Sequence, residues 1–272
     1  MSEQKSRRCM RKKHRIALLN THKKIMKTYV VNMTKDTEKR AQIESQLANH
    51  TELEYQIWKA VEGRKLSRQE QKQMVLPEFY ERYGRNATQP AVGCSLSHIN
   101  IYKDIIENNV KYALVLEDDA ILSNDLKLDK ISQLLNSDSP TAILMTPDFW
   151  YRPDEKVMDV DGKYKIYQLN DGYMTSGYAI NQAAAKLLVP LIYPVKYTAD
   201  AWGMFISFGL QLYGIVPHVI SYPDGYGEIG MSQHVHKNTY EKIRAVAVYF
   251  YIRLLWAMSY LKGNRKSRKE WR

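Results

Sequence analysis

Short apolar runs alternate with amphipathic stretches along the central part of the chain. The runs TYVVNM (28–33), YALVL (112–116) and TAILM (141–145) are aliphatic or β-branched and have the length of buried strands. A further run, ELEYQIWKAVEG (52–63), predicts a strand that closes on a glycine. These runs are too short for helices of typical length, so we expect them to build a sheet.

Helical spacing marks the stretches between these runs. In TKDTEKRAQIESQLANH (34–50), Ile43 and Leu47 recur one turn apart among charged residues. SLSHINIYKDIIENN (95–109) places its apolar side chains on one face, and its Asn-Asn pair predicts the helix end. Both stretches therefore predict amphipathic helices that cover the sheet.

The alternation continues in the second half of the chain. GYMTSGYAI (172–180) predicts a strand, and NQAAAKLLVPLI (181–192) a helix that ends near Pro194. No internal repeat is visible. Strands that alternate with helices in this way are typical of an α/β layered domain with a mixed, largely parallel sheet.

The charge is distributed unevenly. The 272 residues, 44% hydrophobic, carry a formal net charge of +11, but residues 1–27 hold ten Lys/Arg and one acid, and residues 241–272 hold nine and two. The body, residues 28–240, carries 21 basic and 26 acidic side chains, a net charge of −5. We therefore expect a basic N-terminal extension, a mildly acidic folded domain and a basic C-terminal region, and no nucleic-acid partner.

Two features bear on the compartment. Cys9 and Cys94 lie far apart and match no metal-ligand spacing, so we expect no disulfide framework and a reducing environment, the alternative being that the two cysteines pair. The apolar stretch IALL after the N-terminal basic residues is too short for a signal peptide, so we predict no secretion.

The C-terminal stretch AVAVYFYIRLLWAMSYL (245–261) is apolar or aromatic around most of a helix, and a basic tail follows it. Seventeen helical residues span about 25 Å, less than a hydrocarbon core of about 30 Å, and Arg253 lies in their middle. A transmembrane span is thus disfavoured; a helix packed on the body or on a second copy is an alternative. Aromatic side chains and a basic tail suit docking on an anionic membrane surface, which we expect.

Three consecutive carboxylates, Glu117, Asp118 and Asp119, follow the buried run in KYALVLEDDAIL (111–122). In parallel sheets, ligands gather beyond the carboxyl ends of strands. Adjacent carboxylates repel one another unless a cation or hydrogen-bond donors compensate, and oxygen ligands of this kind suit Mg²⁺ or Mn²⁺ bound to a diphosphate. The alternative is an acidic turn that caps the next element.

A second motif lies just upstream. AVGCSLSHINIYKDII (91–106) places Gly93, Ser97 and His98 at an expected helix start, where free N–H groups can bind an anion. His98 could equally be a capping or core histidine. The chain has no Walker sequence and no G-x-G-x-x-G motif, which argues against a P-loop NTPase and a dinucleotide fold.

The order of these motifs over residues 28–235 resembles glycosyltransferase family 25, the lipopolysaccharide glycosyltransferases related to collagen galactosyltransferases. The resemblance rests on G-C-x-L-S-H followed by E-D-D. It implies a GT-A-like fold, with residues 28–240 as the catalytic domain, and inversion at the anomeric carbon. It also implies a UDP-sugar donor, usually UDP-galactose.

The resemblance further implies residue roles. The donor-binding residues would be Asn32, Arg40, Gly93, Ser97, His98, Glu117 and Asp118, with Met33 and Lys39 departing from the family pattern behind the first strand and Glu62 replacing an aspartate before Gly63. Asp119 would be the metal ligand. Asp200, in an acidic segment that matches the family loosely, is the expected catalytic base, although it could instead cap a helix.

Other positions are assigned by their place in the chain. His234 ends the stretch GEIGMSQH, which resembles a region near the end of the family's catalytic domains, and is therefore the first candidate for a second ligand to Mn²⁺ or Mg²⁺, ahead of His218 and His236. A surface histidine is the alternative for each. Tyr173, Thr175 and Ser176 are expected in the acceptor or sugar pocket, or else in sheet packing.

We therefore predict an inverting hexosyltransferase that moves a hexose, galactose being the first candidate, from a UDP-sugar to a glycolipid or oligosaccharide acceptor in lipo-oligosaccharide or lipopolysaccharide biosynthesis. We expect it in the cytoplasm, peripherally bound to the inner (plasma) membrane. One alternative is a metal-dependent phosphohydrolase or nucleotidyltransferase, which typically needs a second carboxylate cluster to hold two metal ions. Another is a non-enzymatic membrane-binding protein.

Overall fold

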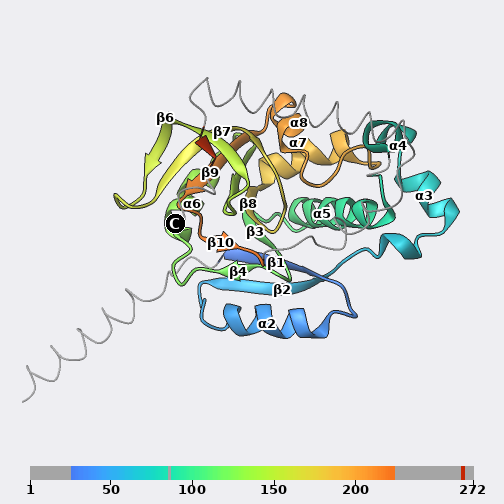
Figure 1. The fold of residues 1–272 in the computed structure, drawn as a ribbon, viewed down its shortest axis with the longest axis horizontal. Coiled ribbons are helices and arrows are strands. Elements are labelled where there is room, and N and C mark those ends of the chain that lie inside the picture. Colours follow the sequence, from blue (N-terminus) through green and yellow to red (C-terminus); the bar gives the residue numbers. More distant parts are fainter. Residues whose placement is uncertain (1–25, 85–86, 224–264, 267–272) are drawn as a thin grey trace, which may run out of the picture.

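A computed structural model describes residues 26–84, 87–223 and 265–266 (Figure 1). Nine strands form one sheet in the order β11-β6-β7-β9-β5-β8-β3-β1-β2, and two short strands pair separately as β10-β4. The predicted mixed α/β sheet is thus confirmed.

One end of the sheet is parallel. β1 (Met26–Asn32) lies between β2 (Leu53–Lys59) and β3 (Tyr112–Glu117) and pairs with both in parallel. All three strands overlap the runs that were predicted to form them, because their aliphatic side chains, such as Val30 and Leu114, are buried in the core. Their carboxyl ends meet at one edge, as the acidic motif requires.

The other part of the sheet is mainly antiparallel. β8 (Gly177–Asn181) runs antiparallel to both β3 and β5 (Thr141–Leu144), and β5 pairs in parallel with β9 (Gln211–Val216). β7 (Lys165–Gly172) and β6 (Phe149–Asp159) extend the sheet as an antiparallel hairpin, and β11 (Arg265–Lys266) pairs with β6. Among the described residues, parallel pairing is therefore limited to three of the eight strand pairs of the large sheet.

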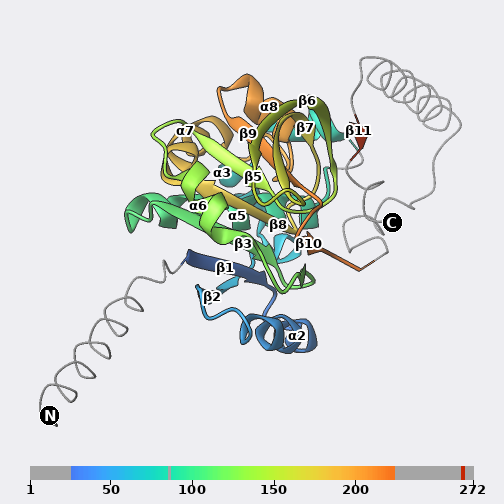
Figure 2. The same ribbon diagram turned by 90° about the vertical axis from the view of Figure 1, so that its left-hand side faces the viewer.

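Helices cover both faces of the sheet (Figures 1 and 2). α5 (Gln89–Glu107), α7 (Gln182–Ile192) and α8 (Trp202–Ser207) pack over the face that carries Tyr29 and Val115. α2 (Thr37–Leu47) and α6 (Leu128–Leu135) pack over the opposite face, against Val30 and Leu116. Successive side chains of each strand point to opposite faces of the sheet, so a sheet with helices on both sides buries consecutive residues of its strands.

Shorter elements complete the chain. η1 (Gly63–Lys65), α3 (Arg68–Met74) and α4 (Pro77–Tyr83) connect β2 to α5, and β4 (Ile121–Leu122) pairs with β10 (Ile220–Ser221). No helix within the described ranges is long and apolar enough to cross a membrane. The expected C-terminal helix, residues 245–261, lies outside the described residues, and of the tail that follows it only β11 (Arg265–Lys266) is described.

One predicted helix boundary is wrong. α5 begins at Gln89, where the Thr88 hydroxyl accepts a hydrogen bond from the Ala91 N–H (3.3 Å) and Pro90 occupies the first turn. Gly93 and His98 therefore lie inside the helix, where backbone N–H groups bond within the helix and do not form a free anion site. The predicted end is confirmed, since Asn108 caps the helix.

Candidate functional site

The acidic triplet lies at the carboxyl end of β3. Glu117 ends that strand and pairs in register with Val31, one residue before the end of β1. Asp118 and Asp119 follow in the turn that leads to β4. The position matches the ligand-binding edge of parallel strands.

Asp118 is held by two neighbours. Asn32 at the end of β1 donates from Nδ2 to Asp118 Oδ2 (2.8 Å), and the Lys39 Nζ lies 3.5 Å from Asp118 Oδ1. Burial raises the pKa of Asp118 in spite of both contacts. Asn32 is itself buried, and its hydrogen bond orients the Asp118 carboxylate. Its contact with a donor stays a prediction.

Glu117 is fixed from the opposite side. Its N–H donates to the Ser176 carbonyl (3.1 Å), and the Thr175 hydroxyl donates a short hydrogen bond to its Oε1. The His98 Nε2 lies 3.8 Å from the same oxygen. Burial alone would raise the pKa of Glu117, but His98, Thr175 and Lys39 together hold it below its ordinary value. Thr175 and Ser176 thus belong to the site as supports of Glu117.

His98 is almost completely buried behind this carboxylate. Its Nδ1 lies 2.8 Å from the Tyr178 hydroxyl, which lies 2.8 Å from the Tyr102 hydroxyl. Its Nε2 has no hydrogen-bond partner among the described residues. A 1% exposed ring does not face solvent, and donor binding by His98 stays a prediction.

Asp119 is the least compensated of the three. Its Oδ2 lies 3.8 Å from the Lys39 Nζ, whereas its buried Oδ1 has no hydrogen-bond partner within the described part of the chain. Burial, and then the neighbouring charge of Glu117, raises the pKa of Asp119 to about 6. An unpartnered carboxylate oxygen beside two other carboxylates fits Mg²⁺ or Mn²⁺, which bind one or two protein oxygens together with phosphate oxygens.

The two basic residues of α2 have different positions. Lys39 reaches the acidic triplet, but Arg40 pairs with Glu44 at 3.3 Å on the exposed side of the helix. Sequence reasoning selected Arg40 and missed Lys39. The signal was available, because Lys39 stands at the first basic position of the family motif.

Gly93 and Ser97 make packing contacts. A Cβ on Gly93 would lie 2.4 Å from the Val61 carbonyl oxygen and 2.6 Å from the Gly63 nitrogen, so only glycine permits this approach. The Ser97 hydroxyl accepts a hydrogen bond from the Val61 N–H (2.8 Å) and donates to the Gly93 carbonyl (2.7 Å). These contacts dock α5 on the segment that follows β2, from Val61 into η1. Donor binding by both residues stays a prediction.

Asp200 lies on the β8 side of the site. Its Oδ2 accepts a hydrogen bond from the Met174 N–H (3.4 Å), and its charge contributes to raising the pKa of Cys94, after burial and Glu117. Its side chain does not cap α8, so the alternative function for this residue is not seen. The charges of Asp200 and Glu117 both act on Cys94, so Asp200 faces the same part of the site, and its function as catalytic base stays a prediction.

Tyr173 is an exposed neighbour of Asp200. Its side chain is 45% exposed, and its hydroxyl donates to Asp171 Oδ2 (3.1 Å). Burial, with the help of Asp171, raises the pKa of Tyr173 to about 12. An exposed ring beside Asp200 fits an acceptor contact. His234 and His236 lie outside the described residues, and His218 is buried.

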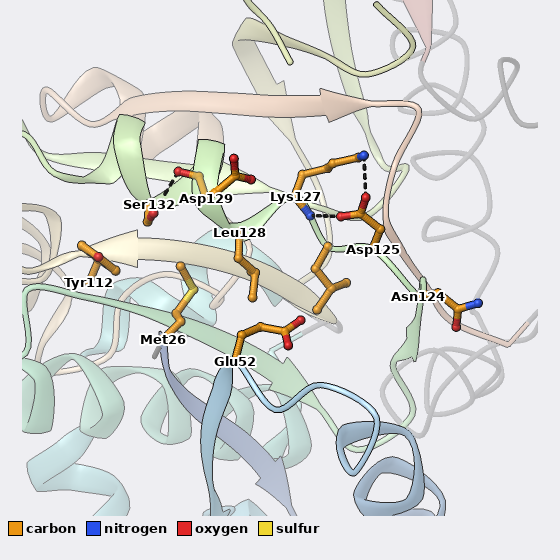
Figure 3. Close-up of a pocket in the computed structure, with 10 residues that line it drawn as sticks. Met26, Glu52, Tyr112, Asn124, Asp125, Lys127, Leu128, Asp129 and Ser132 are labelled. Atoms are coloured by element: carbon orange, nitrogen blue, oxygen red, sulfur yellow. Dashed lines mark hydrogen bonds and ion pairs between the residues drawn. The ribbon is translucent and has the colours of Figure 1, made fainter. Parts of the chain in front are cut away.

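A separate pocket of about 450 Å³ lies at the opposite edge of the sheet (Figure 3). Met26 and Tyr112, the first residues of β1 and β3, line it, and Lys127 bonds to Asp125 beside it. Because it lies at the amino ends of the strands, this pocket does not contact the acidic triplet. We assign the candidate site to the carboxyl edge.

Comparison with known proteins agrees with the geometry. The model of glycosyltransferase family 25 (LPS biosynthesis protein) matches residues 25–202. Procollagen galactosyltransferase 1-A of Xenopus laevis is 29% identical over 223 residues, which cover 73% of this chain and 36% of that protein. A putative glycosyltransferase of Acanthamoeba polyphaga mimivirus is 23% identical over 205 residues, with coverage of 72% and 62%.

The chain spans about a third of the length of the first curated relatives that it matches. Among solved structures, mannose-1-phosphate geranyltransferase from Thermus thermophilus aligns with a TM-score of 0.40 and 9% identity, and the alignment covers 74% of this chain and 75% of that one. The family match includes α2, α5 and the acidic triplet, which are the elements that build the site. The chain therefore belongs to glycosyltransferase family 25.

Proposed function

We propose that this protein is an inverting glycosyltransferase with a GT-A-like fold that transfers a hexose, galactose being the first candidate, from a UDP-sugar to a saccharide hydroxyl. The observation that carries the proposal is Asp119, a carboxylate with an unpartnered oxygen at the carboxyl edge of parallel strands. The family supports a sugar-transfer reaction, and the names of the relatives support galactose.

The residues around Asp119 have separable functions. Asp119 would hold Mg²⁺ or Mn²⁺, which when bound supplies positive charge for the departing diphosphate. Lys39 brings a second positive charge to the same edge. Asn32 orients Asp118, and Thr175 orients Glu117, so neither carboxylate needs to reorganise when the donor binds.

Asp200 is the proposed base. Its Oδ2 is engaged by the Met174 N–H, which leaves Oδ1 to accept the proton of the acceptor hydroxyl. The acceptor oxygen then forms the new bond to the anomeric carbon as the bond to UDP breaks, and UDP leaves on the opposite face. The exposed Tyr173 ring beside Asp200 would contact the acceptor sugar.

A panel of UDP-sugars tests the proposal. Each sugar is offered to the purified protein with and without Mn²⁺ and with and without a saccharide acceptor, and UDP release and product mass are measured. We expect metal-dependent transfer that Asp119→Asn lowers at least about 100-fold, because it removes charge stabilisation of the transition state. Asp138→Asn, the same substitution at an exposed site before β5, is the matched control.

The panel also separates the alternative. A phosphohydrolase would release products equally fast without acceptor, whereas a transferase needs the acceptor for full rate. If no UDP-sugar is bound or turned over, or if Asp119→Asn behaves like the wild type, the proposal is wrong.

We extend the proposal to a glycolipid acceptor of lipo-oligosaccharide or lipopolysaccharide type and to a cytoplasmic enzyme bound at the inner (plasma) membrane. The description of the matching family names LPS biosynthesis. The aromatic and basic composition of residues 241–272 supports docking where such an acceptor is embedded.

A further inference from the structure

A cluster of three different metal-binding side chains joins Glu117 of the acidic triplet to two residues of α5. Cys94 and His98 project from the same face of α5, four residues apart, toward Glu117 at the end of β3. The Cys94 Sγ, a ring nitrogen of His98 and a carboxylate oxygen of Glu117 all lie within 4.8 Å of one another. Side chains from two elements, α5 and β3, thus converge on one small volume.

The orientation of His98 gives an independent sign of a ligand. Its Nδ1 contacts the Tyr178 hydroxyl, which leaves Nε2 directed toward Glu117 at 3.8 Å, too far for a direct hydrogen bond. Nε2 is buried and has no hydrogen-bond partner among the described residues. Leaving a buried polar atom unpaired costs about 1 to 3 kcal/mol. A metal ion bound by the lone pair of Nε2 would remove that cost.

We propose that Cys94, His98 and Glu117 bind a thiophilic divalent cation, Zn²⁺, at a second metal site distinct from Asp119. A sulfur, an imidazole nitrogen and a carboxylate oxygen are ligands that Zn²⁺ prefers, whereas Mg²⁺ binds oxygen ligands alone. Binding replaces the thiol proton of Cys94, which is released to solvent, by the metal. Three protein ligands leave one tetrahedral position for water.

The residues behind His98 match the usual support of a zinc ligand. A histidine that binds zinc through one ring nitrogen commonly makes a hydrogen bond through the other, which fixes its tautomer and ring orientation. Tyr178 occupies that position, and its own hydroxyl is held by Tyr102. The ring of His98 therefore needs little movement to accept an ion at Nε2.

Co²⁺ provides a direct test, because a thiolate bound to Co²⁺ gives a near-ultraviolet charge-transfer band that oxygen ligands do not give. The full chain, freed of metal by a chelator, is titrated with Co²⁺ and then with Zn²⁺. We expect one equivalent of Co²⁺ to produce the band and Zn²⁺ to abolish it. Absence of a thiolate band in the wild-type protein overturns the proposal.

Variants locate the site. The band should disappear in Cys94→Ser and persist in Cys9→Ser, which removes the other cysteine of the chain. It should also persist in Asp119→Asn, so that this test succeeds or fails independently of the metal proposed for sugar transfer. Tyr178→Phe should weaken Zn²⁺ binding about tenfold, as expected for loss of a group behind a ligand. A band that survives Cys94→Ser overturns the assignment.

Thiol protection keeps the proposal testable if Cys94→Ser does not fold. In the wild-type protein, Zn²⁺ should slow alkylation of Cys94 at least about tenfold, measured by peptide mass mapping, while Cys9 serves as the internal reference. Equal alkylation rates of Cys94 with and without Zn²⁺ contradict the site.

Discussion

Glu117, Asp118 and Asp119 are adjacent in sequence but differ in what balances their charge. Thr175 and His98 lower the pKa of Glu117 against its burial, and Asn32 fixes Asp118. Among the described side chains, the cation beside Asp119 is Lys39, whose Nζ lies 3.8 Å from Asp119 Oδ2. The residue left without a full set of partners is the one with the most to gain from a cation.

Asp119→Asn should stabilise the metal-free protein at pH 7.5. The pKa of Asp119 is about 6 in the folded chain against an ordinary value of 3.8, so its ionisation opposes folding. This cost is absent below about pH 4, grows as the pH rises through 6 and is constant above that. We expect a gain of roughly 1 to 3 kcal/mol in the free energy of unfolding at pH 7.5 that shrinks toward pH 4.5. Urea unfolding in a chelator measures it.

With Mn²⁺ present, the wild-type protein should become more stable than Asp119→Asn. The ion binds the wild-type fold and raises its unfolding midpoint, whereas Asp119→Asn should gain much less. Asp138→Asn, at an exposed position, should follow the wild type under all these conditions. A variant that is less stable than the wild type without metal would contradict the assignment of Asp119 as an uncompensated charge.

Lys39 and Arg40 allow a matched comparison on one helix. Lys39→Met removes the positive charge beside Asp118 and Asp119 and should raise the KM for the donor about tenfold, the equivalent of one charge-assisted hydrogen bond. Arg40→Met removes an equal charge that pairs with Glu44 at the surface and should change KM less than about twofold. Steady-state kinetics decide between them. A larger effect at Arg40 would favour the expectation from the family over the geometry.

At the scale of elements, the contact between α5 and the segment that follows β2, from Val61 into η1, positions the site. Gly63 and Gly93 face each other so closely that a Cβ on either would overlap the partner backbone, at 1.7 Å from the Gln89 carbonyl oxygen in the case of Gly63. The same helix carries Cys94 and His98 under Glu117. A shift of α5 toward or away from η1 would therefore move the side chains of Cys94 and His98 relative to the acidic triplet.

Gly93→Ala should destabilise the protein by roughly 1 to 3 kcal/mol, because backbone atoms cannot yield to the new Cβ. The sign is informative, since the same substitution in an uncrowded helix stabilises by about 1 kcal/mol. Ser97→Ala, which removes only the hydroxyl bonded to the Val61 N–H, should cost about 1 kcal/mol. Chemical denaturation measures both, and a Gly93→Ala protein as stable as the wild type would show that the contact is not formed.

The hydrophobic pattern predicted the elements that have one strong period. Buried runs gave β1, β3 and β5, and helical spacing gave α2, α5 and α7, with Ile43 and Leu47 buried as expected. The hairpin of β6 and β7 was not predicted, because several of its side chains are exposed and its register is interrupted by irregularities. GYMTSGYAI does not form one strand: Gly172 ends β7 and β8 begins only at Gly177, since Met174 between them takes a positive φ of 66° and turns the chain.

The site was predictable at the level of motifs but not of contacts. The strand-end position of Glu117–Asp119 followed from the apolar run before it. The pairing of Thr175 with Glu117 depends on β8 lying antiparallel beside β3, which no local pattern encodes. The same holds for Lys39, whose approach to Asp118 depends on how α2 packs.

At the scale of the whole molecule, the excess of basic over acidic side chains lies mostly outside the part of the chain that the structure describes. The described fold is built from the mildly acidic body, whereas most of the basic excess lies in residues 1–27 and 241–272. Of the C-terminal region, the described Arg265 and Lys266 add β11 to the outer edge of the sheet, next to Tyr151 and Trp150 of β6. The site lies at the other end of the sheet order, between β8 and β1.

Vesicle binding tests whether the C-terminal region docks on membranes. Residues 241–272 combine nine basic side chains with Tyr249, Tyr251, Trp256 and Tyr260, so the full chain should sediment with vesicles that contain phosphatidylglycerol, and high salt should release it. A chain that ends at residue 240 should stay in solution and keep its transfer rate toward a soluble sugar acceptor. Loss of both properties together would argue against a separate docking function.

A charge variant makes the same test while keeping β11. Replacing four basic residues of the tail by glutamine leaves Arg265 and Lys266 in place; the four are Lys262, Arg268, Lys269 and Arg272. Each charge near an anionic surface contributes up to about 1 kcal/mol, so the affinity for anionic vesicles should fall at least about tenfold while transfer to a soluble acceptor continues. Because the aromatic residues remain, binding that does not weaken would assign membrane contact to them and not to the basic tail.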